Sequence, residues 1–157
     1  MQVISLSIYR NHPSHMLYNQ PMIVSAVEAE FIWRLSFLCV LSFVYAVCRK
    51  YYDLALVPLA IWITSMVYWY HPVDGWRRYL DISVVALALS WQVYRAWFAE
   101  YRLIYYCVVG IAILFYVIGK LLDPIDSILA TIAHGALHVF ANLSNLILYS
   151  GYIPPLY

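Results

Sequence analysis

Apolar positions along the chain gather into five long runs, separated by short polar turns. The runs cover residues 31–48, 54–70, 79–98, 103–119 and 127–148. Each is close to the ~20 residues that an α-helix needs to cross the ~30 Å hydrocarbon core of a bilayer. Backbone polar groups in lipid must be satisfied within the protein, so we interpret the runs as helices. The pattern predicts an all-α integral membrane bundle of about five transmembrane helices.

The first 28 residues differ from the rest of the chain. They mix polar and apolar side chains and contain two prolines, so no apolar stretch there reaches the length of a span. We expect residues 1–28 to form an arm at the membrane interface or in water, and residues 29–157 to form one transmembrane domain.

Composition agrees with a membrane location. The chain is 65% hydrophobic and 11% charged, whereas a soluble domain has about 25% charged residues. Nine Lys and Arg nearly balance eight Asp and Glu, so no basic surface points to nucleic acid. The expected partners are membrane lipids and other membrane proteins. Lys and Arg divide almost evenly between the two ends of the spans, which leaves the orientation open.

Two histidines interrupt the last apolar run. His134 and His138 are four residues apart, which on a helix means about 40° of rotation and roughly 6 Å of rise. Both imidazoles therefore share one face and can bind one metal ion. Histidine within a span is functional by default, although this spacing also occurs where histidines bond a neighbouring helix. We expect Gly135 to allow close approach of another helix or a lipid chain, and Gly110 to be a close packing point.

The order of the spans places two further ionisable residues at the same depth. His71 ends the second run and Asp81 opens the third, on the side of the membrane where the last run begins. Three neutral nitrogen ligands, an open position for water and a nearby acid are what a catalytic zinc ion needs. We expect His71, His134 and His138 to be the zinc ligands, and Asp81 to be the general base or a direct ligand.

Two asparagines extend the polar face of the last run. Asn142 and Asn145 are placed to polarise a substrate carbonyl or to cap the cavity, and we take Asn145 as a second catalytic candidate. A simpler interpretation of Asp81 also stays open, because it can pair with Arg77 or Arg78 in the preceding turn.

The ordered set His71, Leu80-Asp81 and His134-Gly-Ala-Leu-His138-Val-Phe resembles the CREST superfamily of membrane hydrolases, and most closely the alkaline ceramidases. In that family a histidine ends the second helix, a Leu-Asp pair opens the third, and the last helix carries HxxxH followed by an aromatic residue. The resemblance implies hydrolysis of a ceramide-like lipid amide by zinc-activated water, with the three histidines as ligands and Asp81 positioning the water. An endomembrane location, of the endoplasmic reticulum or Golgi type, is the accompanying expectation.

The chain departs from the family pattern at two points. The family has seven spans, whereas this chain is predicted to have about five. The absence of two spans would still leave the histidines and Asp81 on the same side of the membrane. The family also places a serine four residues before the first histidine, where this chain has Val67. Thr64 and Ser65 lie nearby on the same run but at other spacings.

Two other functions remain open. The chain is also compatible with a structural or interaction subunit of a membrane assembly, in which a metal only joins the second and fifth spans. Its sixteen tyrosines and six tryptophans fit such a packing role. A haem-binding cytochrome would need axial histidines on facing helices, for which His71 and His134 are the candidates. A retinal protein is excluded, because the last run contains no lysine.

Overall fold

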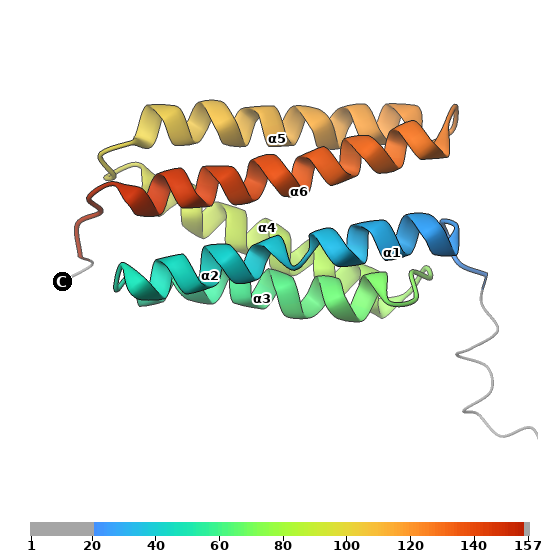
Figure 1. Ribbon diagram of the computed structural model, residues 1–157, viewed down its shortest axis with the longest axis horizontal. Helices are drawn as coiled ribbons and strands as arrows, with labels where there is room; N and C mark the ends of the chain where they lie inside the picture. The colour runs from blue at the N-terminus through green and yellow to red at the C-terminus, as the bar shows by residue number, and fades with distance from the viewer. Residues whose placement is uncertain (1–20, 156–157) are drawn as a thin grey trace, which may run out of the picture.

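The computed structural model describes residues 21–155, which form helices and turns with no strand (Figure 1). The first two helices follow one another along one line, and the others run antiparallel to their neighbours in sequence. The helices are α1 (Ala26–Leu35), α2 (Leu38–Cys48), α3 (Tyr52–Trp69), α4 (Trp76–Ala96), α5 (Arg102–Leu122) and α6 (Ser127–Ser150). The all-α prediction is confirmed for these residues.

The first predicted run is two helices instead of one. The Ser36 hydroxyl donates to the carbonyl oxygen of Ile32 at 3.1 Å, and the Phe37 N–H turns to the carbonyl of Arg34 at 3.2 Å. A serine that bonds back to its own helix commonly bends it. Ahead of this break, Ser25 begins α1 with a capping box. The last residues of the predicted arm are therefore helical, while residues 1–20 lie outside the described part of the chain.

Four helical segments among the described residues are long and apolar enough to cross a membrane. They are the continuous stretch Ala26–Cys48 together with α3, α5 and α6. By length and composition, four segments therefore qualify as spans, fewer than the expected five or so. The remaining helix, α4, has 21 residues but is much more polar than the others. The polar residues of α4 include Arg77, Arg78, Asp81, Gln92 and Arg95.

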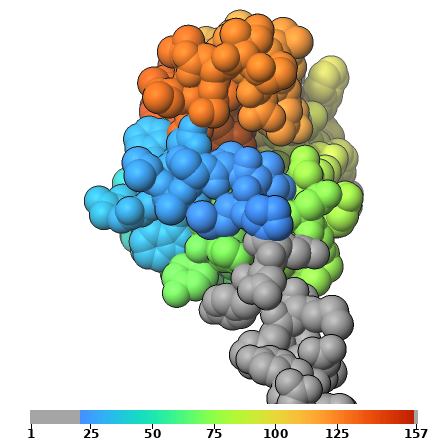
Figure 2. Space-filling view, turned by 90° about the vertical axis from the view of Figure 1, so that its right-hand side faces the viewer, coloured from blue at the N-terminus to red at the C-terminus, as the bar shows by residue number. Residues whose placement is uncertain are grey.

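The turns gather at two ends of the bundle. The start of α1, the α3–α4 turn and the α5–α6 turn lie at one end, called here the first end (Figure 1). The α2–α3 turn, the α4–α5 turn and the segment after α6 lie at the second end. Figure 2 views the first end, where α1 lies between the α5–α6 turn and the start of α4. This alternation brings the end of α3, the start of α4 and the start of α6 to a common end, as span counting predicted.

The α5–α6 turn joins two closely packed helices. A Cβ added to Gly119 in α5 would lie 3.6 Å from the Cβ of Ala133 in α6, which is ordinary contact distance. The Asp126 carboxylate caps α6 by accepting from the N–H groups of Ile128 and Leu129 at 2.9 and 3.0 Å. This cap satisfies backbone donors that the helix itself leaves free and fixes where α6 begins.

Gly135 is closely packed against another helix, whereas Gly110 is not. A Cβ at Gly135 would lie 2.8 Å from Phe31 Cε1 and 2.9 Å from Leu35 Cδ1, so the predicted close approach is confirmed and its partner is α1. A Cβ at Gly110 would meet no atom of the described residues within 4 Å. The prediction that Gly110 is a packing point is wrong, because the residue lies on the exposed face of α5.

A tyrosine of α6 donates the hydrogen bond that a proline inside α3 cannot supply. Pro58 has no N–H, so the carbonyl of Leu54, four residues earlier, loses its helical partner. The Tyr149 hydroxyl donates to that carbonyl oxygen at 3.3 Å and accepts from Gln92 Nε2 of α4 at 2.8 Å. Leu54 and Tyr149 are fully buried. One side chain thus joins α3, α4 and α6.

Candidate functional site

The two histidines of α6 lie one helical turn apart and face each other. The ring centroids of His134 and His138 are 5.2 Å apart, with 52° between the ring planes. Trp69, the last residue of α3, packs with its ring centroid 5.1 Å from that of His134. The expectation that both imidazoles share one face is confirmed, and that face turns toward α3.

Asp81 lies in the second turn of α4 and is buried, with 8% of its surface exposed. Its Oδ1 accepts a hydrogen bond from the Thr64 hydroxyl at 2.7 Å and from the Ser65 hydroxyl at 2.9 Å. Both donors belong to α3. Arg78 instead pairs with Asp74 at 3.1 Å, so the alternative in which it pairs with Asp81 is not the arrangement found. Two hydroxyls therefore hold the carboxylate of Asp81.

The two hydroxyls bond Asp81 of α4, whereas the expected serine position is exposed. Val67 is 42% exposed and points away from the bundle, whereas Ser65 is buried against α4. A hydroxyl at position 67 would therefore point outward in this fold. Thr64 and Ser65 supply the hydroxyl groups beside Asp81 instead.

His71 lies in the α3–α4 turn, two residues beyond Trp69, and is partly buried. The turn is at the first end of the bundle, which is also where α6 begins (Figure 1). Within residues 21–155, however, no group of three or more His, Cys, Asp or Glu side chains is arranged to hold a metal ion. The described arrangement supplies a pair of imidazoles, and does not bring His71 or Asp81 into one cluster with them.

The two asparagines are engaged in bonds between helices. Asn142 Nδ2 donates to the carbonyl oxygen of His138 at 2.8 Å, and its Oδ1 accepts from the Ser42 hydroxyl of α2 at 2.8 Å. Asn145 Oδ1 accepts from Gln92 Nε2 at 2.9 Å. Both asparagines are 6% exposed. Asn142 thus joins α6 to α2, and the catalytic role of Asn145 stays a prediction.

Polar side chains follow one face of α6 along most of its length. They recur every three or four residues, which is the spacing of one helix face. At the second end the polar contacts continue in an ion pair between the buried Arg95 and the partly exposed Asp53, at 2.7 Å. Gln92 and Arg95 were not predicted to be part of this polar network. Their position as polar residues within a long apolar run could have indicated it. The row consists of His134, His138, Asn142, Asn145 and Tyr149.

No protein-family model matches the chain. Comparison with curated proteins and with solved structures likewise finds no significant match. The chemistry of the described residues is therefore the basis for assigning a function.

Proposed function

We propose that the protein is a zinc-dependent intramembrane hydrolase of lipid amides, of the alkaline ceramidase type. The observation that carries the proposal is the buried Asp81 carboxylate held by two hydroxyls, at the same end of the bundle as the histidine pair. Buried acids are costly inside a membrane protein and usually mark function. An acid with oriented oxygens, at the same end of the bundle as two imidazoles, suits proton transfer during amide hydrolysis.

We propose further that α4 is a fifth transmembrane span. Its buried polar side chains, among them Asp81, Gln92 and Arg95, turn toward the other helices. Its exposed surface carries large apolar side chains instead. A membrane helix places polar groups in the bundle interior in this way, while apolar groups face lipid. The exposed apolar residues of α4 include Leu80, Ile82, Val85, Leu87, Trp91 and Val93. The proposed location is an endomembrane of the endoplasmic reticulum or Golgi type.

In this proposal His134 and His138 provide two of the nitrogen donors that zinc prefers. His71 supplies the third nitrogen ligand when its side chain rotates from its position in the α3–α4 turn toward His134 and His138. A bound zinc ion would supply Lewis acidity, which activates water and polarises a carbonyl near neutral pH. Asp81 accepts and returns the proton, and the hydroxyls of Thr64 and Ser65 fix the orientation of its carboxylate. The substrate is a ceramide-like lipid amide.

An amide hydrolysis assay with the purified full chain tests the proposal. The wild type is expected to cleave a fluorescent ceramide analogue in lipid–detergent micelles, and Asp81→Asn to lower the rate by about 10²-fold or more. Asp74→Asn is the matched control, because Asp74 is an exposed acid in the preceding turn. A wild type that cleaves no lipid amide, or an Asp81→Asn variant as active as wild type, would overturn the assignment.

A second candidate function is a structural subunit of a membrane assembly. The observation that favours it is the use of buried amides for bonds between helices, with Asn142 bonded to Ser42 and Asn145 to Gln92. Such networks give rigidity and a unique packing. This candidate predicts a stoichiometric complex after mild detergent extraction and no hydrolysis. A monodisperse monomer that turns over lipid amides would exclude it.

A further inference from the structure

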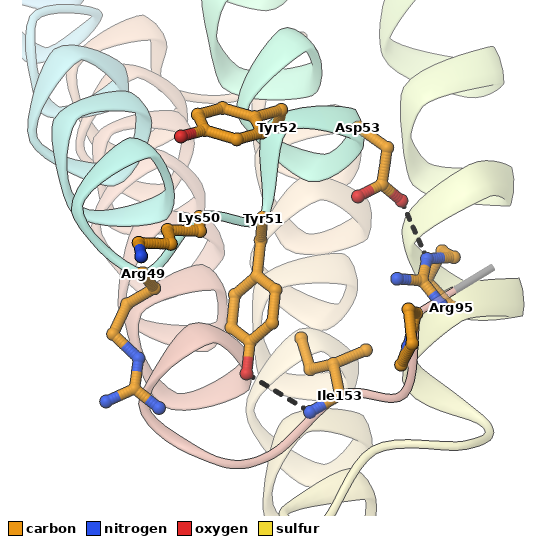
Figure 3. Close-up of a pocket in the computed structure, with 8 residues that line it drawn as sticks. Arg49, Lys50, Tyr51, Tyr52, Asp53, Arg95 and Ile153 are labelled. Atoms are coloured by element: carbon orange, nitrogen blue, oxygen red, sulfur yellow. Dashed lines mark hydrogen bonds and ion pairs between the residues drawn. The ribbon is translucent and has the colours of Figure 1, made fainter. Parts of the chain in front are cut away.

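A cavity of about 400 Å³ lies at the second end of the bundle (Figure 3). The α2–α3 turn contributes Arg49, Lys50 and Tyr51 to its wall, α3 contributes Asp53, and α4 contributes Arg95. The segment after α6 closes another side. The turn ends two membrane-length helical segments, so the cavity lies at the depth of the lipid headgroups.

The cavity carries more positive than negative charge. Arg95 and Asp53 pair with each other at 2.7 Å and compensate one another. Arg49 and Lys50 are exposed, and neither forms an ion pair in the part of the chain that the structure describes. In Figure 3 these two cations lie together on one side of Tyr51, and the Asp53–Arg95 pair lies on the other. Arg49 Nη2 also donates to the carbonyl oxygen of Gly151 at 3.4 Å, and its guanidinium carbon lies 6.0 Å from the Tyr51 ring centroid. The remaining N–H groups of Arg49 and the ammonium of Lys50 are the donors available to an anion.

Lys50 occupies a backbone position that favours glycine. Its φ is 63°, the left-handed region, and it is the one non-glycine residue with positive φ among those described. The Tyr51 N–H bonds the carbonyl of Ala46, and the Lys50 N–H bonds the carbonyl of Val47, both at 2.9 Å. This is the Schellman arrangement, in which a side chain at the left-handed position is unfavourable. A lysine there gives up backbone stability and places a cation at the cavity.

The start of α3 adds a second source of positive potential. Among residues 21–155 no side chain caps α3, whose first-turn N–H groups and helix dipole favour an anion. The Asp53 carboxylate in that turn is directed to Arg95 (Figure 3). Tyr51 is fixed between the two flanks, because its hydroxyl donates to the carbonyl of Gly151 at 2.8 Å and accepts from the Ile153 N–H at 3.2 Å. The wall of the cavity is therefore preorganised.

We propose that this cavity binds the phosphate of an anionic phospholipid headgroup, with Lys50 and Arg49 as the principal ligands. Lipid phosphate is the anion that a membrane protein meets at this depth. Leu56, one turn after Tyr52 on the same face of α3, is 64% exposed and provides apolar surface for an acyl chain. The site lies at the opposite end from the histidine pair and does not depend on the hydrolase proposal.

Thermal unfolding of the purified full chain in detergent tests the site. Phosphatidylglycerol, phosphatidylcholine and inorganic phosphate are added separately, and each variant is compared with its own ligand-free midpoint. We expect phosphatidylglycerol to raise the wild-type midpoint several-fold more than the other two. Lys50→Gly should lose this rise while still folding, because glycine suits the backbone there. Lys120→Gln removes an exposed cation at the first end and should keep the rise.

Each outcome decides the proposal. A rise in Lys50→Gly and in Arg49→Gln equal to that of the wild type would overturn the site, as would no rise in the wild type. An equal rise with phosphatidylcholine would show that the anionic headgroup is not what is recognised. An equal rise with inorganic phosphate would show that the cavity takes a soluble phosphate, and the lipid assignment would be wrong.

Discussion

The Thr64 hydroxyl of α3 lies 2.7 Å from Asp81 Oδ1 of α4 and donates a hydrogen bond to it. Ser65, the next residue of α3, donates to the same oxygen at 2.9 Å. Hydrogen bonds to a carboxylate are stronger than those between neutral groups, and a buried acceptor that loses one is left incompletely satisfied. The two bonds therefore attach α4 to α3 and hold the buried acid in place.

Replacing Thr64 by valine should weaken this attachment. Thr64→Val keeps a similar shape but removes the hydroxyl, and we expect a loss of about 1–3 kcal/mol in the free energy of unfolding. Denaturant unfolding in detergent measures the change. Ser90→Ala is the control, because the Ser90 hydroxyl is exposed and bonds only the carbonyl of Ala86 in its own helix. Equal stability of Thr64→Val and wild type would show that the bond to Asp81 contributes nothing.

The sequence predicted those features of the site that helix geometry fixes. The shared face of His134 and His138 follows from their spacing, and the common end with Asp81 follows from the alternation of spans. It did not predict the hydroxyl partners of Asp81. Which face of α3 meets α4 depends on the rotation of both helices about their axes, and an almost uniformly apolar helix leaves that rotation open.

A side chain at Gly135 should separate α1 from α6. Gly135→Val places atoms where Phe31 and Leu35 now lie, and overpacking of this kind costs about 1–3 kcal/mol. Gly110→Val is the matched control, since a Cβ there meets no atom of the described residues within 4 Å. Thermal unfolding midpoints of the two variants in the same detergent give the comparison. Equal midpoints would contradict the close contact between Gly135 and α1.

The sequence also does not distinguish the environments of Gly135 and Gly110. Both lie in apolar runs, and a small residue is compatible either with close packing or with a surface that faces lipid. Only the position of the neighbouring helices separates the cases. The break after α1 has a similar origin, because Ser36 bonds back to Ile32 within a run whose composition indicates one continuous helix.

Loss of the Tyr149 hydroxyl should destabilise the bundle near its second end. Tyr149→Phe removes the donor to the Leu54 carbonyl and the acceptor for Gln92, leaving buried polar groups without these partners. The expected cost is about 1–3 kcal/mol for the unfolding free energy. Tyr116→Phe is the control, because that side chain is 43% exposed on α5. Similar unfolding midpoints for both variants would refute the bridging role of Tyr149.

The partners of the polar residues in α4 were also not predictable from the sequence. Counting apolar residues predicts a span at 79–98, whereas the complete helix includes charged residues at its first turn and two buried polar residues, Gln92 and Arg95, toward its end. Gln92 and Arg95 each bond a partner from another helix: Gln92 bonds Asn145, and Arg95 pairs with Asp53. Such pairings form only in the folded bundle, so the sequence alone does not reveal them.

Zinc content of the purified protein shows whether the α6 histidines bind a metal ion. The full chain is purified in zinc-replete buffer, dialysed, and measured by plasma mass spectrometry as wild type and as the double variant His134→Ala with His138→Ala. A second double variant, His12→Ala with His15→Ala, controls for non-specific binding to histidine. We expect a stoichiometric amount of zinc in the wild type and in the control, and its loss from the α6 variant. A wild type without zinc, or zinc retained after removal of both α6 histidines, would contradict this expectation.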